Sequence, residues 1–221
     1  SSAGGHADLA VFPPFAYLSL TESMLSGTHV LWGGQTLNPN AHGAHTGETS
    51  GGMLTDMGCR YVLVGHSERR SIYAESDDDV ALRFKAALAA GLEPVLCVGE
   101  TREEREHGQT EAVVGRQLDA VTGSVGIQAF SRAIIAYEPV WAIGTGLTAT
   151  PGQAQAVHRF IRDKMSALDV TIAGQLRILY GGSVKGSNAA ELFTQSDIDG
   201  GLVGGASLTA EDFLAIYRAV A

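Results

Sequence analysis

Short apolar runs recur along the chain, and each ends in glycine, proline or a polar residue before a segment with helical periodicity begins. Seven such runs occupy residues 8–12, 29–34, 60–66, 94–100, 133–139, 176–182 and 200–205. Their apolar residues are consecutive rather than alternating, which is typical of parallel strands covered on both faces. The alternation of such strands with helices predicts an α/β protein built on a parallel sheet.

Signals for the start and the end of helices fill the segments between these runs. Ser76 precedes three aspartates, as expected of an N-cap before an acidic first turn, and Gly91 ends the same helix. Thr150 is followed by Pro151 at the first helical position, and Thr209 opens the last helix. No linker or low-complexity segment interrupts the pattern, so the whole chain, 1–221, is predicted to form a single domain.

Two folds share this alternation, a doubly wound sheet and a closed barrel, and the polar residues at the ends of the runs distinguish them. Such residues and glycines follow five different runs, at Gln35, His66, Glu68, Glu138, Ser183, Gly204 and Gly205. A doubly wound sheet forms its site at one crevice, whereas a barrel brings the C-terminal ends of all its strands to one rim. The pattern therefore favours a (β/α)8 barrel, of which the sequence supplies seven strands.

Composition and charge exclude several classes of protein. The 221 residues carry a formal net charge of −9 and no block of lysine and arginine, which argues against nucleic acid or an anionic membrane as a partner. No apolar run approaches the roughly 20 residues of a membrane span, and the N-terminus lacks the plan of a signal peptide, so we expect a cytoplasmic protein.

Cys59 and Cys97 lie in strand-like runs, which predicts buried thiols rather than a disulfide or zinc site. His42 and His45 lack a third ligand, so no metal or other cofactor is predicted.

The segment AYEPVWAIGTG combines one acid with rigid and flexible residues. Glu138 ends an apolar run, where a partly desolvated carboxylate can act as a base; the alternative is an acid bonded to backbone amides in a surface turn. Pro139 stiffens one end of the following loop, and Gly144 and Gly146 loosen the other. Trp141, between them, is too apolar for an idle surface tip. The segment therefore predicts a hinged lid that excludes water from above the base.

His66 ends another strand-like run and precedes a helix start at Ser67. A helix N-terminus disfavours the imidazolium, so a neutral ring could donate a hydrogen bond to a carbonyl oxygen. The alternative is a structural histidine, with SERR (67–70) as an ordinary helix start stabilised by an ion pair.

Glycine pairs follow the last two predicted strands, in YGGSV (180–184) and LVGGAS (202–207). They could be ordinary turns between strand and helix. Because barrels of this class often bind a phosphate at this place, the pairs also suggest backbone amides that hold a phosphate together with Ser183.

Taken in order, six motifs closely resemble the triosephosphate isomerase family over the chain from about residue 8 to the C-terminus. They are GETS (47–50), YVLVGHSERR (61–70), PVLCVGET (94–101), AYEPVWAIGTG (136–146), YGGSV (180–184) and LVGGAS (202–207). The resemblance implies an isomerase that interconverts dihydroxyacetone phosphate and glyceraldehyde 3-phosphate, in glycolysis and gluconeogenesis, without a cofactor.

The resemblance also implies roles for particular residues. Glu138 shuttles the proton between the two substrate carbons, and His66 polarises the carbonyl. Glu68 supports the site, and Cys97 packs beneath it. Residues 139–146 form the closing lid, which keeps water from the enediolate.

The phosphate would be bound by the family's loops at the ends of three strands. The resemblance assigns it to the amides of Gly144, Ser183, Gly204 and Gly205. Tyr180 and Ser183 would latch the closed lid.

The resemblance implies a TIM barrel and a homodimer. The chain begins where the family's second strand is about to start, so we expect a barrel lacking the first strand and helix in this chain, with seven βα units. The loop 44–48 would insert into the neighbouring subunit's site, although His45 stands where an aromatic residue is usual.

The family's first strand carries an Asn and a Lys that contact the substrate, and neither is found in the sequence. Lys85, Lys164 and Lys185 are the only lysines, and none follows a strand-like run closely enough to replace it. Two interpretations stay open: an active isomerase, or an inactive or weakly active phosphate-binding remnant of the same fold. A Schiff-base aldolase, which needs a lysine at a strand end, ranks last.

Overall fold

The computed structural model describes residues 7–143 and 148–219. The chain divides into two compact units, which are described in turn. We call 8–97 with 119–134 the N-terminal unit, and the described parts of 1–7, 98–118 and 135–221 the C-terminal unit. The expectation of a single domain over 1–221 stays a prediction.

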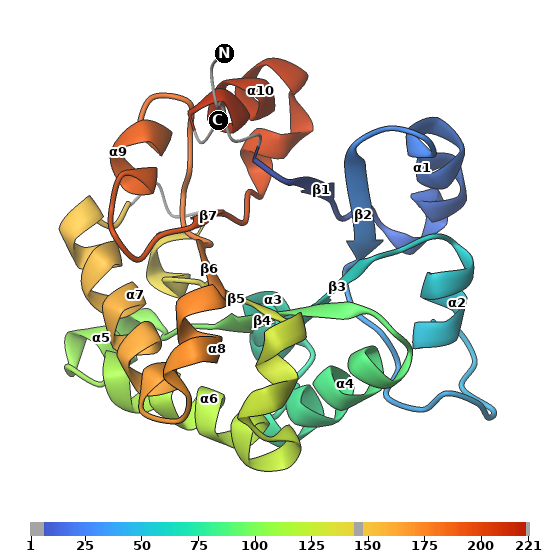
Figure 1. The fold of residues 1–221 in the computed structure, drawn as a ribbon, viewed down its shortest axis with the longest axis horizontal. Coiled ribbons are helices and arrows are strands. Elements are labelled where there is room, and N and C mark those ends of the chain that lie inside the picture. Colours follow the sequence, from blue (N-terminus) through green and yellow to red (C-terminus); the bar gives the residue numbers. More distant parts are fainter. Residues whose placement is uncertain (1–6, 144–147, 220–221) are drawn as a thin grey trace. The chain divides into compact units, whose positions relative to one another are not determined.

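Four parallel strands form the sheet of the N-terminal unit, and they lie in chain order. Register pairs Leu9 with Val30, Gly33 with Tyr61, and Tyr61 with Glu93. Helix α1 packs on β2, and α4 packs on β3 (Figure 1). The elements are β1 (Leu9–Val11), the 3-10 turn η1 (Phe15–Tyr17), α1 (Leu18–Leu25), β2 (Val30–Gly34), α2 (Gly51–Asp56), β3 (Tyr61–Val64), α3 (Ser67–Ile72), α4 (Asp77–Ala89), β4 (Glu93–Val98) and η2 (Ile127–Arg132).

The C-terminal unit continues the alternation of strands and helices. Gly181 N donates to Tyr137 O over 2.7 Å at the ends of β5 and β6, and β6 pairs in parallel with β7. Helix α7 packs on β6, α8 and α9 (Figure 1). The elements are α5 (Arg102–Glu106), α6 (Thr110–Val125, which ends in the N-terminal unit), β5 (Ile134–Tyr137), η3 (Val140–Ala142), α7 (Pro151–Ser166), α8 (Val170–Gln175), β6 (Arg177–Tyr180), α9 (Ala189–Phe193), β7 (Gly200–Gly201), η4 (Gly205–Leu208) and α10 (Ala210–Arg218).

Each of the seven apolar runs coincides with one of the seven strands found in residues 7–143 and 148–219, as predicted, although β4 begins one residue before its run. The helix starts at Ser76 and Thr150 are also confirmed, because each side chain accepts from the third backbone N–H of its helix in a reciprocal capping box. Thr209 precedes α10 as predicted; its hydroxyl donates to the Asp212 carboxylate but accepts no capping bond from the backbone.

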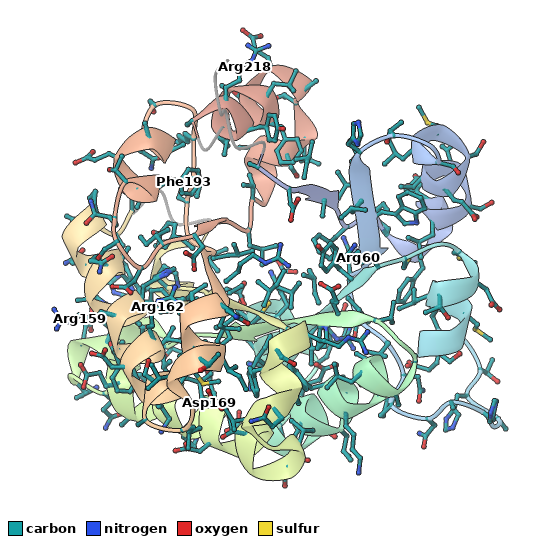
Figure 2. The ribbon with its side chains drawn as sticks, viewed as in Figure 1. Arg60, Arg159, Arg162, Asp169, Phe193 and Arg218 are labelled. Carbon is teal, nitrogen blue, oxygen red and sulfur yellow. The ribbon has the colours of Figure 1, made fainter. Side chains whose placement is uncertain are left out.

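Arg162 connects α7 to the backbone around β6 and β7 (Figure 2). Its guanidinium donates to the carboxylates of Asp197 and Asp199 over 2.9 and 2.7 Å. It also donates to the carbonyls of Ala173 and Leu176 over 2.7 and 2.9 Å. One side chain, 18% exposed, thus holds the end of α8 and the segment that leads into β7.

Both cysteines are free and buried, as the sequence predicted. Burial, with a smaller contribution from Glu22, raises the pKa of Cys59 to about 11, so this thiol stays protonated at neutral pH. Among the described residues, no helix combines the length and the apolar character required to cross a membrane.

Candidate active site

Glu138 lies directly after β5 in the C-terminal unit, and only 2% of its surface is exposed. Its backbone N–H donates to the carbonyl of Val98 over 2.7 Å, at the end of β4. The bond from Gly181 to Tyr137 holds the preceding residue from the other side. The backbone of the acid is therefore fixed by the strand ends on both sides.

Two glycines allow this close packing around Glu138. A Cβ at Gly99 would overlap the carbonyl oxygen of Glu138, and a Cβ at Gly181 would lie 3.0 Å from its Cγ. Real Cβ atoms essentially never come as close as the first contact, and the second is tighter than most. A side chain at either position would displace the acid, so the glycines act here through the space they leave.

Glu100 is the centre of a buried hydrogen-bond network that the sequence analysis did not single out. It is 0% exposed, and one carboxylate oxygen accepts from Tyr137 Oη, Trp141 Nε1 and Arg105 Nη1, each over 3.1 Å. The Arg105 guanidinium lies 4.4 Å from the centroid of the Trp141 ring, a cation–π contact. Glu100 stands just after β4, as Glu138 stands just after β5. This position after a buried strand is the sequence feature that could have identified Glu100 as a site residue.

This network anchors the segment that follows Glu138. Trp141, three residues after the acid, is bonded through its indole N–H and stacked through its ring. Burial, followed by the charge of Glu100, raises the pKa of Tyr137, so its hydroxyl stays a donor to the carboxylate. Glu100 and Arg105 balance each other's charge, which a buried carboxylate requires.

Changing each of the two tryptophans to phenylalanine, in separate variants, compares the stability contributed by a hydrogen bond to a charged acceptor with that of a bond to a neutral acceptor. Trp141 donates to a carboxylate, whereas Trp32 donates to the carbonyl of Met57 over 2.8 Å. Trp141→Phe is expected to lower the free energy of unfolding by about 2 kcal/mol and Trp32→Phe by about 1 kcal/mol. Urea unfolding measures both. Equal losses, or a larger loss at Trp32, would contradict the importance assigned to Glu100.

Pro139 and Tyr180 converge on Gly182. A Cβ at Gly182 would overlap the Tyr180 hydroxyl and lie 2.9 Å from Pro139 Cγ. Burial raises the pKa of Tyr180, while its contact with the backbone of Ala149 lowers it in part. Tyr180, which is predicted to latch the lid, therefore lies near Pro139, the first residue of the lid.

The residues predicted to bind phosphate follow β6 and β7. Ser183 is half-buried, and its carbonyl accepts from Asn188 Nδ2 over 3.1 Å. Gly204 and Gly205 are exposed, and a Cβ at either would meet nothing within 4 Å, so there is open space above them. Gly144 and Gly146 lie outside the described residues.

His66 and Glu68 lie together in the N-terminal unit, at the start of α3. The Nδ1 atom of His66 accepts from the backbone N–H of Glu68 over 3.3 Å, so the ring itself is the N-cap of the helix. A nitrogen that accepts in this way carries no proton, which leaves a neutral ring with its proton on Nε2. The Glu68 carboxylate lies 3.8 Å from the same nitrogen and is 68% exposed.

Arg70 braces the turn that carries His66. It donates to the carbonyls of Gly65 and Cys97 over 2.8 and 3.3 Å and to the Asp77 carboxylate over 2.7 Å. Gly65 has a φ of +72°, a conformation that side chains rarely adopt. Arg70 of SERR thus pairs with Asp77, which lies outside that motif, and its bond to the Gly65 carbonyl holds the strand end before His66.

Comparisons with known proteins agree with the motifs. The model of the triosephosphate isomerase family matches residues 1–220. The triosephosphate isomerase of Dechloromonas aromatica is 59% identical over 212 residues, covering 96% of this chain and 85% of that protein. Those of Thiobacillus denitrificans and Xanthomonas campestris are 59% and 58% identical over 214 residues each, covering 97% of this chain and 86% and 85% of those proteins. With a family match over nearly its whole length and this level of identity, the chain belongs to the triosephosphate isomerase family.

Proposed function

We propose that the protein interconverts dihydroxyacetone phosphate and glyceraldehyde 3-phosphate by proton transfer through an enediolate. Glu138 is the base, and His66, as a neutral donor from Nε2, polarises the carbonyl. Glu68 supports the site at the start of α3. The observation that carries the proposal is the buried carboxylate of Glu138, 2% exposed and fixed by its backbone at a strand end.

The phosphate of the substrate is bound by backbone amides after β6 and β7. The exposed backbone at Gly204 and Gly205 supports this role, since the space above them is open. Ser183 and Gly144 complete the set, and the lid over 139–146 excludes water while Tyr180 and Ser183 latch it. Water exclusion protects the enediolate phosphate from losing its phosphate.

We infer that the protein acts as a homodimer in the cytoplasm, as its family membership suggests. Two large apolar side chains of the N-terminal unit, Ile72 and Tyr73 at the end of α3, are 69% and 66% exposed and support a partner surface there. Sedimentation measures the mass, and a monomer at micromolar concentration would contradict the dimer.

Turnover in deuterated water tests the reaction directly. With dihydroxyacetone phosphate as substrate, NMR should detect glyceraldehyde 3-phosphate with deuterium at C2, the carbon to which Glu138 delivers a proton, and deuterium at the hydroxymethyl carbon of the remaining dihydroxyacetone phosphate. Product formation without any exchange would contradict an enediolate stage at which the protonated Glu138 exchanges with the solvent, and would favour a direct hydride shift. If neither product nor deuterium exchange is detected, the proposal that the protein is an isomerase is wrong.

A second function is a phosphate-binding protein with weak or no turnover. In that case 2-phosphoglycolate, a phosphorylated carboxylate, binds in calorimetry while deuterium exchange stays at the background rate.

A further inference from the structure

His158 is a buried polar residue that the proposed reaction does not use. It is 0% exposed and lies on the buried face of α7. The other buried residues of that face are apolar: Ala154, Val157, Ile161 and Met165. Because burying an imidazole has a desolvation cost, its two nitrogens require partners.

The tautomer of His158 follows from its contact with Asp197. Nδ1 lies 3.0 Å from the backbone carbonyl oxygen of Asp197, which can only accept, so Nδ1 carries the proton. Burial lowers the pKa of His158 to about 4, and the nearby Arg162 acts in the same direction. The ring is therefore neutral at pH 7, with an unprotonated acceptor at Nε2.

That acceptor and a neighbouring donor both lack partners. Within the described part of the chain, His158 Nε2 makes no hydrogen bond, and the proton of the Tyr180 hydroxyl has no acceptor, because the contact of that hydroxyl with the Ala149 backbone lowers its pKa and so uses the oxygen as acceptor. The two rings are 6.3 Å apart between centroids, with 39° between their planes. Tyr137 also contacts His158, edge to face at 5.8 Å, but its hydroxyl already donates to Glu100. Tyr180 is thus the donor that remains for Nε2.

We propose that the Tyr180 hydroxyl donates to His158 Nε2, so that His158 is a positioning residue for Tyr180. The centroid distance of 6.3 Å is compatible with a hydroxyl and a ring nitrogen at hydrogen-bond distance, since both atoms lie on the outside of their rings. A hydroxyl that donates its one proton to His158 turns its lone pairs elsewhere, and the backbone N–H of Ala149 is the group already close to it. Each bond strengthens the other, because a polarised hydroxyl is the better acceptor.

The inference deepens the proposed function, since it rests on Tyr180 acting at that site. His158 then links α7 to two strand ends, through Tyr180 at the end of β6 and through the carbonyl of Asp197 before β7. An apolar residue would fill the same space on α7 but could not fix the direction of the Tyr180 proton.

Nitrogen-15 NMR of histidine rings tests the bond without any need for turnover. His158→Gln identifies the signals of His158 among the seven histidines. In the parent protein with 2-phosphoglycolate, the Nε2 signal should move when Tyr180 is changed to phenylalanine, while the Nδ1 signal stays. An Nε2 signal that is the same in the parent and in Tyr180→Phe overturns the proposal.

A double-mutant cycle provides a kinetic readout. His158→Phe and Tyr180→Phe are each expected to lower kcat/KM about tenfold, and the double variant by about the same tenfold. His158→Gln, which retains an acceptor oxygen, should stay within about threefold of the parent. Additive effects, about a hundredfold in the double variant, would contradict the coupling. If the chain has no isomerase activity, the proposed function fails, while the NMR result still decides the bond.

Discussion

Glu138→Gln is expected to lower kcat about a thousandfold, equivalent to about 4 kcal/mol of transition-state stabilisation. Glutamine has the shape of glutamate but does not accept a proton at neutral pH. The backbone bonds that hold residue 138, from its N–H to Val98 and from Gly181 to Tyr137, do not involve the side chain. We therefore expect 2-phosphoglycolate to bind within a fewfold of the parent affinity, as measured by calorimetry.

The matched control is Glu106→Gln, on the exposed face of α5. Glu106 is 62% exposed and pairs with Arg102 one turn away, an interaction of small value. This variant should retain the parent kcat. A Glu138→Gln protein that turns over within tenfold of the parent would show that another group removes the proton.

Arg162→Met should lower the free energy of unfolding by about 3–5 kcal/mol. The change leaves the carboxylates of Asp197 and Asp199 without their cation, and the carbonyls of Ala173 and Leu176 without their donor. The Asp197 carboxylate still accepts from Gln155, and the Asp199 carboxylate from the backbone N–H of Ile178, so each keeps a hydrogen bond but loses its charged partner. Denaturation by urea gives the difference.

Arg159→Met is the control on the same helix, because it shows whether the loss of any arginine from α7 lowers the free energy of unfolding. Arg159 is 73% exposed, forms only a 3.5 Å pair with Asp163 among the interactions described, and points away from the unit (Figure 2). Its replacement should change the free energy of unfolding by less than about 0.5 kcal/mol. A similar loss of unfolding free energy in the two variants would show that the bonds of Arg162 to α8 and to the residues before β6 and β7 do not stabilise the protein specifically.

The central strands were the most clearly predictable, because both of their faces are covered. Consecutive apolar residues with no polar interruption mark β3 and β4, which are buried along nearly their whole length. Helix starts were predictable where one side chain bonds to its own helix, as at Ser76 and Thr150. The predicted class of fold and the family are confirmed by the match over residues 1–220.

Interactions between distant parts of the sequence were not predictable. Glu100 receives its donors from residues 5, 37 and 41 positions away, and Arg162 bonds to residues 35 and 37 positions away. The spacing of such residues follows no period. The crowding at Gly99 has the same origin, since its neighbour is the carbonyl of Glu138. His66 was predicted beside a helix start, but that its own ring caps the helix depends on the side-chain rotamer.

Trp141 makes the protein its own optical probe. Its indole lies between a carboxylate at the nitrogen and a guanidinium over the ring, and the electric field of such charges shifts the emission of the excited ring. In a Trp32→Phe background it is the only tryptophan, three residues from Glu138. Fluorescence of that variant therefore reports, without any label, when a phosphorylated ligand disturbs the contact with Glu100, and rapid mixing gives the rate of that event.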